Sequence, residues 1–466
     1  MLFSSISFLY YFLPCVLILY FISPKMLRNT VLLISSLAFY AWGEPKYVVL
    51  MAVGIVVGYA AGLLIDRYRG RRASKVFLGL SAAVSVGILI YFKYADFFIT
   101  SFNSVTGMSL PLLRIALPVG ISFYTFQILS YTIDVYRGTV SAQRNLIDLA
   151  AYVSMFPQLI AGPIVRYSDI ARQLKKREHS FEKAASGIRI FIIGFAKKIL
   201  IANTLGELCT AYNETGERSV IFCWMYAIAY ALQIYFDFSG YSDMAIGLGR
   251  IFGFEFCENF RYPFISGSIT EFWRRWHISL GSWFRDYIYI PLGGSRVNTV
   301  RRFRNIFVVW MLTGLWHGAS WNFVIWGLYF AVLLVIEKIF LLRYLDRSKV
   351  LGHIYVIFTV LISFVIFSSE SFSGIWECLS GMFGAGGLPV VSPEQSYLLR
   401  SYAAVLLIAV IGATPLPKML AEKLKTLKWG DHAVTIAEPL ILAAALMICT
   451  AYLVDGSFNP FLYFRF

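Results

Sequence analysis

Charge is scarce in this sequence. Asp, Glu, Lys and Arg together make up 14% of the 466 residues, whereas soluble proteins carry about a quarter. Hydrophobic residues account for 58%, and long apolar stretches recur from one end of the chain to the other. This balance excludes an ordinary soluble domain and indicates a protein that lies in a lipid bilayer.

Paired cysteines and the common catalytic motifs are also missing. The cysteines stand at 15, 209, 223, 257, 378 and 449 without a CxxC pair, so neither a disulfide framework nor a metal site is indicated. The chain has no glycine-rich phosphate loop, no HExxH and no GxSxG. We expect no metal and no bound cofactor. The lack of an obvious Ser or Cys nucleophile argues against a covalent enzyme intermediate.

The apolar runs predict the fold class. Runs long enough to cross about 30 Å of hydrocarbon lie at residues 6–22, 46–65, 76–95, 219–236, 352–368 and 434–454. Together with broken segments they predict an all-α polytopic membrane protein of about 10–11 transmembrane helices plus re-entrant and interfacial helices. No repeat or long polar linker divides the chain, so one integral membrane domain is expected over 1–466, with a catalytic core at approximately 110–340. A basic amphipathic helix is expected at 415–429.

The net charge of +15 is concentrated in short loops. Lys25 and Arg28 follow the first apolar run, and further basic stretches occupy 66–75, 172–189 and 296–304. By the positive-inside rule these loops are cytoplasmic and the N-terminus lies outside. We expect membrane lipids and an acidic carrier in the cytoplasm as partners of the basic loops, and no nucleic acid.

Polar and turn residues interrupt the middle third of the chain. The interrupted segments are 116–138, 155–169, 235–243, 270–294 and 313–322. Irregular backbone at membrane depth persists only inside protein or along a wet cavity. We therefore expect these segments to enclose one shared cavity.

Residues 305–340 are too long for one crossing. A straight helix of about 36 residues would measure about 54 Å, and basic side chains flank both of its ends. The natural turning point is GLWHG, where Gly314 and Gly318 bracket His317. We predict a sharply bent or re-entrant pair of helices with His317 near its tip.

Two of the five histidines, His277 and His317, stand in polar, tryptophan-rich sequence. An ionisable side chain at such a place is expensive and marks function by default, although a satisfied hydrogen bond between helices is the alternative. A continuous helix through 270–287 would carry two faces. One is aromatic and the other is polar, comprising Thr270, Arg274, His277, Gly281 and Arg285. We expect the polar face to line a cavity; an interfacial anchor with snorkelling arginines is the other interpretation.

These residues suit acyl transfer. An imidazole takes a proton from a hydroxyl near neutral pH, and Arg and Trp can hold the phosphates and adenine of a nucleotide-bearing acyl donor. The candidate catalytic residues are His317 and His277. The candidate residues for the donor or the cavity wall are Trp273, Arg274, Arg275, Trp276, Trp316, Asp286 and Asp237.

The run FWRRWHISLGSWFRDYIYIPLGG, followed by GLWHGASWNFVIWG, resembles the membrane-bound O-acyltransferase (MBOAT) family. MFPQLIAGPIVRY, YFDFSGYSDMAIGLGRIFGF and ENFRYPFISGSITEFW are similar to its bacterial branch that contains the membrane subunit of alginate O-acetylation. FSSISFLYYFLP near the start and NPFLYFRF at the end extend the likeness over nearly the full length.

The resemblance implies a ring of helices around a central tunnel in the bacterial cytoplasmic membrane. It implies that His317 is the essential base and that His277, the more variable position, supports donor binding or lines the tunnel. Acetyl-CoA or an equivalent cytoplasmic thioester would be the donor. The acceptor would be an extracytoplasmic glycan or a partner protein, often with a separate extracytoplasmic acetyltransferase. Arg465 departs from the family pattern, where an uncharged polar residue is expected.

Two other functions fit parts of this pattern. A teichoic-acid D-alanyl transferase has similar histidine motifs, but YIPLGGSR and NPFLYFRF favour the acetyltransferase. An envelope transporter or flippase would use the same cavity without chemistry. Such a protein is expected to contain paired membrane carboxylates or inverted repeats. Asp237 and Asp243 are the nearest candidates, and we favour a helix-capping or hydrogen-bonding role for them.

Overall fold

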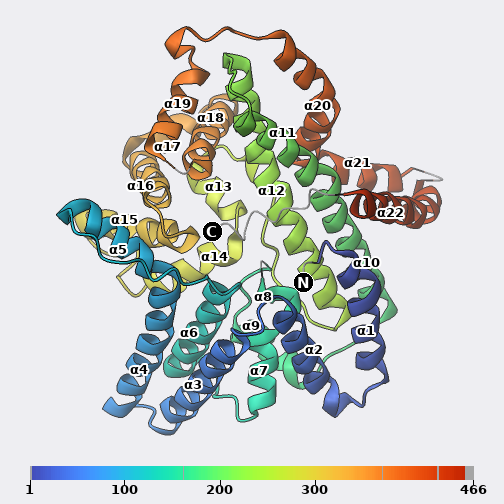
Figure 1. Ribbon diagram of the computed structural model, residues 1–466. Helices are drawn as coiled ribbons and strands as arrows, with labels where there is room; N and C mark the ends of the chain where they lie inside the picture. Colours follow the sequence, from blue (N-terminus) through green and yellow to red (C-terminus); the bar gives the residue numbers. More distant parts are fainter. Residues whose placement is uncertain (1–2, 161, 370, 428–429, 457–466) are drawn as a thin grey trace. The chain divides into compact units, whose positions relative to one another are not determined.

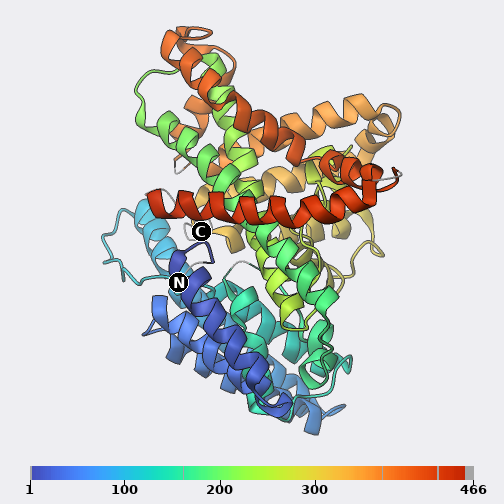
Figure 2. The same ribbon diagram turned by 90° about the vertical axis from the view of Figure 1, so that its right-hand side faces the viewer.

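Helices joined by loops form the protein in the computed structural model (Figures 1 and 2). The structure describes residues 3–160, 162–369, 371–427 and 430–456. No β-strand occurs in these ranges. The predicted all-α class is confirmed.

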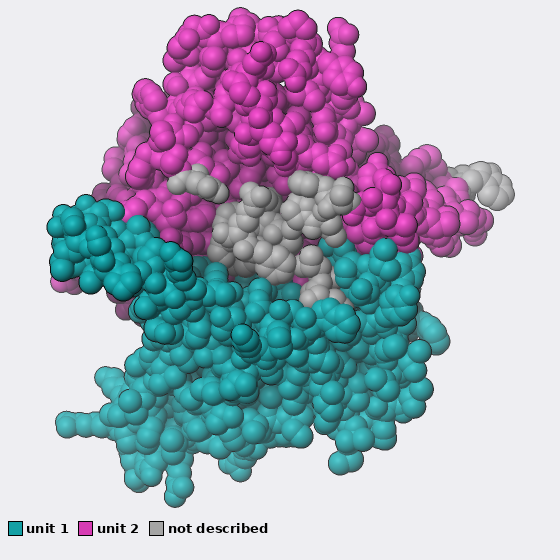
Figure 3. Space-filling model, viewed as in Figure 1, with its two compact units in different colours: residues 1–191, 244–257 teal, residues 192–243, 258–466 magenta. Residues whose placement is uncertain are grey.

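The helices group into two compact units, coloured separately in Figure 3. Unit 1 comprises residues 1–191 and 244–257, and unit 2 comprises residues 192–243 and 258–466. Unit 1 holds α1 (Leu13–Ile22), α2 (Arg28–Gly43), α3 (Val48–Arg67), α4 (Arg72–Leu89), α5 (Ala95–Thr106), α6 (Ile121–Arg137), α7 (Leu146–Ser154), α8 (Phe156–Leu159) and α9 (Tyr167–Lys175). The predicted single domain stays a prediction.

Unit 2 contains the segments from which the sequence predicts chemistry. Its helices are α11 (Asn203–Glu214), α13 (Ile269–Arg275), α14 (Ile278–Phe284), α15 (Thr299–His317), α16 (Trp321–Ile336), α17 (Leu342–Leu345), α18 (Lys349–Ser368), α19 (Phe372–Met382), α20 (Pro393–Gly412), α21 (Leu416–Lys425) and α22 (Gly430–Asp455). Two further helices, α10 (Phe181–Ala196) and α12 (Val220–Ile251), contribute residues to both units.

Seven helical segments among the described residues are long and apolar enough to cross a membrane: Val48–Arg67, Arg72–Thr106, Val220–Ile251, Trp321–Leu345, Lys349–Ser368, Pro393–Gly412 and Gly430–Asp455. A shorter apolar helical stretch covers Ser7–Ile22. All six predicted apolar runs fall on these segments, which confirms a polytopic membrane protein. The larger count of about 10–11 crossings stays a prediction.

The predicted interruption at residues 235–243 is wrong, because α12 runs unbroken through it. The small residues there serve close helix packing. A Cβ at Gly240 would lie 2.6 Å from the Gly194 carbonyl oxygen, so only glycine fits at this contact. Asp237 pairs with Lys198, whose Nζ lies 2.8 Å from the carboxylate, and therefore does not cap a helix end.

The predicted turn at GLWHG is confirmed. Helix α15 ends at His317 and α16 begins at Trp321, so the two form a helical hairpin. Its arms approach closely because the Cα of Gly327 lies 3.4 Å from the position that a Cβ on Gly314 would occupy. The hairpin fixes His317 at the tip.

The C-terminal part of the chain contains the expected amphipathic helix, a long apolar helix and a motif outside the described residues. The expected amphipathic helix at 415–429 is present as α21, and its place at a membrane interface stays a prediction. Figure 2 shows the following helix, α22, as one long helix, and 6% of its apolar window is buried. Arg465 and the motif NPFLYFRF lie outside the described residues.

Candidate active site

The helix predicted through residues 270–287 breaks at His277, which corrects that prediction. Helix α13 ends at Arg275, and His277 has a φ of 45° in the left-handed region before α14 begins. An extended segment supplies the hydrogen bonds that a continuous helix would have made. The Arg261 amide donates to the Arg275 carbonyl oxygen at 2.9 Å, and the Ile278 amide donates to the Asn259 carbonyl oxygen at 3.0 Å.

Each of the two segments that exchange these hydrogen bonds contains a strained backbone residue. Tyr262 in the extended segment has a φ of 46°, and it is also not a glycine. Non-glycine residues keep such conformations only where their surroundings fix them, and these residues concentrate at functional sites. The geometry around His277 is therefore imposed by tertiary contacts.

The His277 side chain is buried, with 2% of its surface exposed. Its Nδ1 lies 3.2 Å from Oδ1 of Asn259, and the Phe238 ring stands edge-on at 4.7 Å. His277 lies outside the candidate spans, and burial lowers its pKa from 6.5 to about 3. The imidazole is therefore neutral at physiological pH. Its Nε2 is buried and has no hydrogen-bond partner among the described residues.

His317 also lies in an aromatic environment. The ring centroids of Trp326 and Phe367 lie 4.9 Å and 5.4 Å from that of His317. The Trp316 ring lies 5.0 Å from His317 and 5.7 Å from His277. The indole is therefore a shared neighbour of the two histidines, which the fold brings together from segments forty residues apart in sequence numbering.

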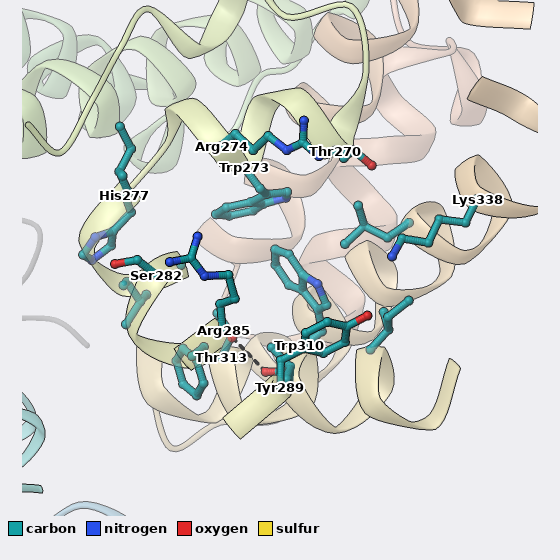
Figure 4. Close-up of a pocket in the computed structure, with 17 residues that line it drawn as sticks. Thr270, Trp273, Arg274, His277, Ser282, Arg285, Tyr289, Trp310, Thr313 and Lys338 are labelled. Carbon is teal, nitrogen blue, oxygen red and sulfur yellow. Dashed lines mark hydrogen bonds between the residues drawn. The ribbon is translucent and has the colours of Figure 1, made fainter. Parts of the chain in front are cut away.

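A cavity of about 480 Å³ in unit 2 is lined by His277 but not by His317 (Figure 4). Residues from α13, α14, α15, α16 and the π-helical segments that follow α14 and α16 line it: Thr270, Trp273, Arg274, His277, Ile278, Leu280, Gly281, Ser282, Phe284, Arg285, Tyr289, Ile306, Val309, Trp310, Thr313, Leu334 and Lys338. All five residues of the predicted polar face are present in this set. Trp273 and Leu280 of the aromatic face line it as well, because the break at His277 ends the helical periodicity, so the predicted separation of the two faces is wrong.

Three cations, Arg274, Arg285 and Lys338, stand around the cavity, and no carboxylate occurs in its lining as described. In Figure 4 the Lys338 amine lies at one end and the His277 imidazole at the other. The aromatic wall includes Trp273 and Trp310, whose ring centroids are 4.6 Å apart. Such a cavity can hold a ligand that has both anionic and flat apolar groups.

Several predicted residues lie apart from this cavity. Arg275 is bound to Glu271 at 2.8 Å and donates to the Arg261 carbonyl oxygen. Trp276 is buried against the rings of Phe272, Phe260 and Phe364. Asp286, Asp237 and Trp316 do not line the cavity either. Asp286 pairs with Arg285 at 2.6 Å, Asp237 pairs with Lys198, and Trp316 packs between the histidines.

The interrupted segments contribute unequally. The lining draws on 270–294 and, through Thr313, on 313–322, whereas residues 235–243 do not take part. Segments 116–138 and 155–169 belong to unit 1.

Sequence reasoning missed three residues that support the site. Lys338 lines the cavity from the π-helical segment Glu337–Leu341, which continues α16. Glu337 is buried and accepts hydrogen bonds from the Ile269 amide at 2.6 Å, from the Thr270 amide at 2.9 Å and from the Thr270 hydroxyl at 2.6 Å. It therefore caps α13 and fixes that helix against the end of α16. A signal existed in the adjacent charges that close the apolar run VLLVIEKIF.

Asn259 is the third of these residues. Its side-chain oxygen contacts His277 and also accepts from the Ser279 amide at 3.1 Å and the Ser279 hydroxyl at 2.9 Å. Its only sequence signal was its place in ENFRYPF.

This combination of a helical membrane body, paired histidines and a cationic cavity fits an acyl-transfer protein, and comparison with known proteins identifies the class. A family model described as "MBOAT, membrane-bound O-acyltransferase family" matches residues 140–376. The chain belongs to the membrane-bound O-acyltransferase family, and it is an acyltransferase.

The names of its relatives specify the reaction more closely than the family name does. The chain is 40% identical over 499 residues to the probable alginate O-acetylase AlgI of Azotobacter vinelandii, which covers 100% of both chains. It is 33% identical over 459 residues to the peptidoglycan O-acetyltransferase of Helicobacter pylori, with 90% of this chain and 87% of that protein covered. The similarity to the teichoic acid D-alanyltransferase of Bacillus subtilis is 31% over 233 residues, or 48% of this chain and 59% of that protein.

Proposed function

We propose that this acyltransferase is an O-acetyltransferase that moves an acetyl group from a cytoplasmic thioester across the membrane to an extracytoplasmic polysaccharide. The observation that carries the proposal is a pair of histidines that share Trp316 as a neighbour, one of which, His277, lines a cationic, aromatic cavity. The relatives aligned over most of the chain are named for O-acetylation, of alginate in one case and of peptidoglycan in the other. Their names support an acetyl group and a polysaccharide acceptor.

His317 is the proposed general base. Its imidazole takes the proton of the acceptor hydroxyl while the hydroxyl oxygen attacks the carbonyl carbon of the thioester. A C–O bond forms, the C–S bond breaks, and the departing sulfur receives the proton back from the imidazolium. No covalent bond to the enzyme is needed, in agreement with the lack of an obvious nucleophile in the sequence. The tip of the α15–α16 hairpin holds the ring in place for this reaction.

The cavity is the proposed donor site, and acetyl-CoA is the proposed donor. Its volume of about 480 Å³ lies within the range of about 300–1,000 Å³ for ligand pockets. The guanidinium group of Arg274 and the ammonium of Lys338 suit the phosphates of the donor, whereas the Arg285 guanidinium already pairs with Asp286. Trp273 and Trp310 offer the apolar faces that a flat base requires.

Replacing Arg274 with Gln is expected to raise the KM for acetyl-CoA by a factor of about 10–150, because a charge-assisted hydrogen bond to a phosphate contributes about 1.5–3 kcal/mol. The KM for the acceptor should stay the same. Arg275→Gln is the matched control, since that side chain is held by Glu271 and lies outside the cavity lining. Initial rates measured with each substrate varied in turn test this. An increase confined to the acceptor KM would put the donor elsewhere.

His277 is proposed to support the donor. We expect His277→Ala to reduce transfer strongly, by about tenfold or more, because the variant loses a buried polar group that lines the cavity. Single-turnover rates in the purified protein measure the loss. A rate equal to that of the wild type would show that the WRRWH motif serves only as an anchor at the membrane interface.

The cellular setting is also a proposal. We place the chain in the bacterial cytoplasmic membrane with its N-terminus outside and its basic loops in the cytoplasm, where a thioester donor or an acyl carrier is found. The helices would form a ring around a central tunnel. The acceptor would be a glycan or a partner protein on the outer side, with an extracytoplasmic acetyltransferase to complete the reaction.

The alternatives receive less support. A D-alanyl transferase fits the histidine motifs, but the relative with that name aligns with 48% of this chain. A transporter would be favoured by paired membrane carboxylates, whereas Asp237 and Asp243 pair with Lys198 and Lys197. No specific observation favours either alternative.

One experiment tests the proposed reaction directly. The purified protein in lipid nanodiscs is incubated with acetyl-CoA labelled in its acetyl group and with a hydroxyl acceptor such as an alginate oligosaccharide or a peptidoglycan fragment. We expect release of the CoA thiol together with labelled acceptor. Release of labelled D-alanine from a carrier in a parallel reaction, without acetyl transfer, would support the D-alanyl alternative instead.

A further inference from the structure

The amide of Asn259 has only one orientation that its neighbours permit. The Ser279 backbone amide, 3.1 Å away, can only donate, so it must face the oxygen of the Asn259 side chain. The Ser279 hydroxyl donates to the same oxygen at 2.9 Å. An Asn259 side chain turned by 180° would place two donors against each other. Backbone geometry at the start of α14 therefore fixes which Asn259 atom faces His277.

This orientation determines the protonation of His277. Its Nδ1 lies 3.2 Å from the Asn259 oxygen, which is an acceptor, so Nδ1 must carry the hydrogen. In a neutral imidazole the other nitrogen, Nε2, then has a lone pair and accepts hydrogen bonds. Nε2 is buried and has no hydrogen-bond partner among the described residues, although His277 lines the cavity. A buried acceptor is costly unless a ligand supplies a donor.

The chemistry of the cavity indicates which ligand group would meet Nε2. Figure 4 shows the His277 imidazole at one end of the cavity next to Ser282, away from Lys338. The cations suit the phosphates of a thioester donor, and the arm that joins the phosphates to the sulfur in CoA contains amide N–H groups. An amide N–H is an uncharged donor of the kind that an unprotonated imidazole nitrogen accepts.

We propose that Asn259 is a positioning residue, which holds His277 as the Nδ1-protonated tautomer so that Nε2 accepts a hydrogen bond from an amide N–H of the acyl donor's arm. This inference rests on the proposed function, because it names the part of the donor that the cavity recognises. It assigns no proton transfer to His277. The role of His277 is to distinguish a donor that offers an N–H at this point from one that does not.

The tautomer is measured by ¹⁵N NMR on the full-length protein in nanodiscs with labelled histidine, and the His277 signals are assigned from their loss in His277→Gln. We expect Nε2 to give the signal of an unprotonated nitrogen and Nδ1 that of an N–H. Adding acetyl-CoA should shift the Nε2 signal. A protonated Nε2 in the wild type, or no shift at a saturating concentration of acetyl-CoA, would overturn the proposal.

Kinetics on two variants complete the test. Asn259→Leu has a similar size but no acceptor, so we expect a changed His277 tautomer and a KM for acetyl-CoA about tenfold higher, the loss of about one hydrogen bond. Asn213→Leu, the matched control, makes the same substitution at an exposed asparagine on α11 and should keep both the tautomer and the KM. An Asn259→Leu protein with an unchanged tautomer and KM, or with only the acceptor KM raised, would contradict the proposal.

An error in the proposed acetyl transfer and an error in the role of Asn259 would give different experimental results. If the proposed acetyl transfer is wrong, the wild type transfers no acetyl group in nanodiscs. If only the role of Asn259 is wrong, an active wild type gives an unexpected His277 tautomer or an Asn259→Leu variant with unchanged kinetics. Should Asn259→Leu not fold, the wild-type NMR response to acetyl-CoA decides the question alone.

Discussion

Replacing His317 with alanine is expected to abolish acyl transfer while the protein remains folded in the membrane. General base catalysis contributes about 10²–10⁴-fold to a rate, so the residual transfer should approach the uncatalysed background. The fold should survive because His317 is the last residue of α15, and the hairpin arms are held by the contact between Gly314 and Gly327. Label transfer from acetyl-CoA measures the activity, and thermal unfolding in detergent checks the fold.

Two variants control this experiment. His317→Gln retains a side chain of similar length without a titratable nitrogen and should be as inactive as the alanine variant. His432→Ala changes an exposed histidine on α22 and should behave as the wild type. Transfer at the wild-type rate in a folded His317→Ala protein would rule out His317 as the base.

Replacing Asp237 with alanine is expected to cause the largest loss of stability. The Lys198 and Asp237 side chains are 2% and 4% exposed, and Lys198 also donates to Asn203 at 2.8 Å. Removing one partner of a buried ion pair costs about 3–5 kcal/mol, because the remaining charge loses its counter-ion in a medium of low polarity. Unfolding of the purified protein in a mixed-detergent titration measures this loss.

The neighbouring ion pair offers a matched comparison. Lys197 and Asp243 lie 2.7 Å apart, but their side chains are 25% and 28% exposed, so Asp243→Ala should cost less than Asp237→Ala. A double variant, Lys198→Met with Asp237→Leu, should recover much of the stability lost in Asp237→Ala. If Asp237→Ala were as stable as the wild type, the ion pair would not stabilise this region.

Much of the architecture was predictable because it depends on local patterns. The six apolar runs became helices, since spanning lengths of apolar residues have few other ways to satisfy their backbone. The turn after His317 followed from the length of residues 305–340 and from the glycines of GLWHG. The polar residues from Thr270 to Arg285 line a cavity as expected, although the continuous helix behind that expectation does not form.

The break at His277 could not be predicted from local sequence. Helix propensity and periodicity in WRRWHISLGSW favour one continuous helix, and the hydrogen bonds that interrupt it come from Asn259 and Arg261 in another segment. Tertiary contacts override local preference there. The opposite error occurred at residues 235–243, where glycine and serine suggested a break but serve the close packing of an intact α12.

The supporting residues escaped sequence reasoning for a similar reason. Glu337 and Lys338 are adjacent at the end of an apolar run, but one turns to the start of α13 and the other to the cavity. Asn259 lies eighteen residues before His277, in a segment without regular structure. Only the folded chain brings these side chains to the site.

The most direct test of the central claim is mass spectrometry of envelope polysaccharides from cells that contain either the wild-type chain or His317→Ala at equal abundance. Acetyl transfer through His317 predicts O-acetyl groups on one polymer in the wild type and their loss in the variant. Identical O-acetylation in the two strains, or loss of D-alanine rather than acetyl, would contradict it.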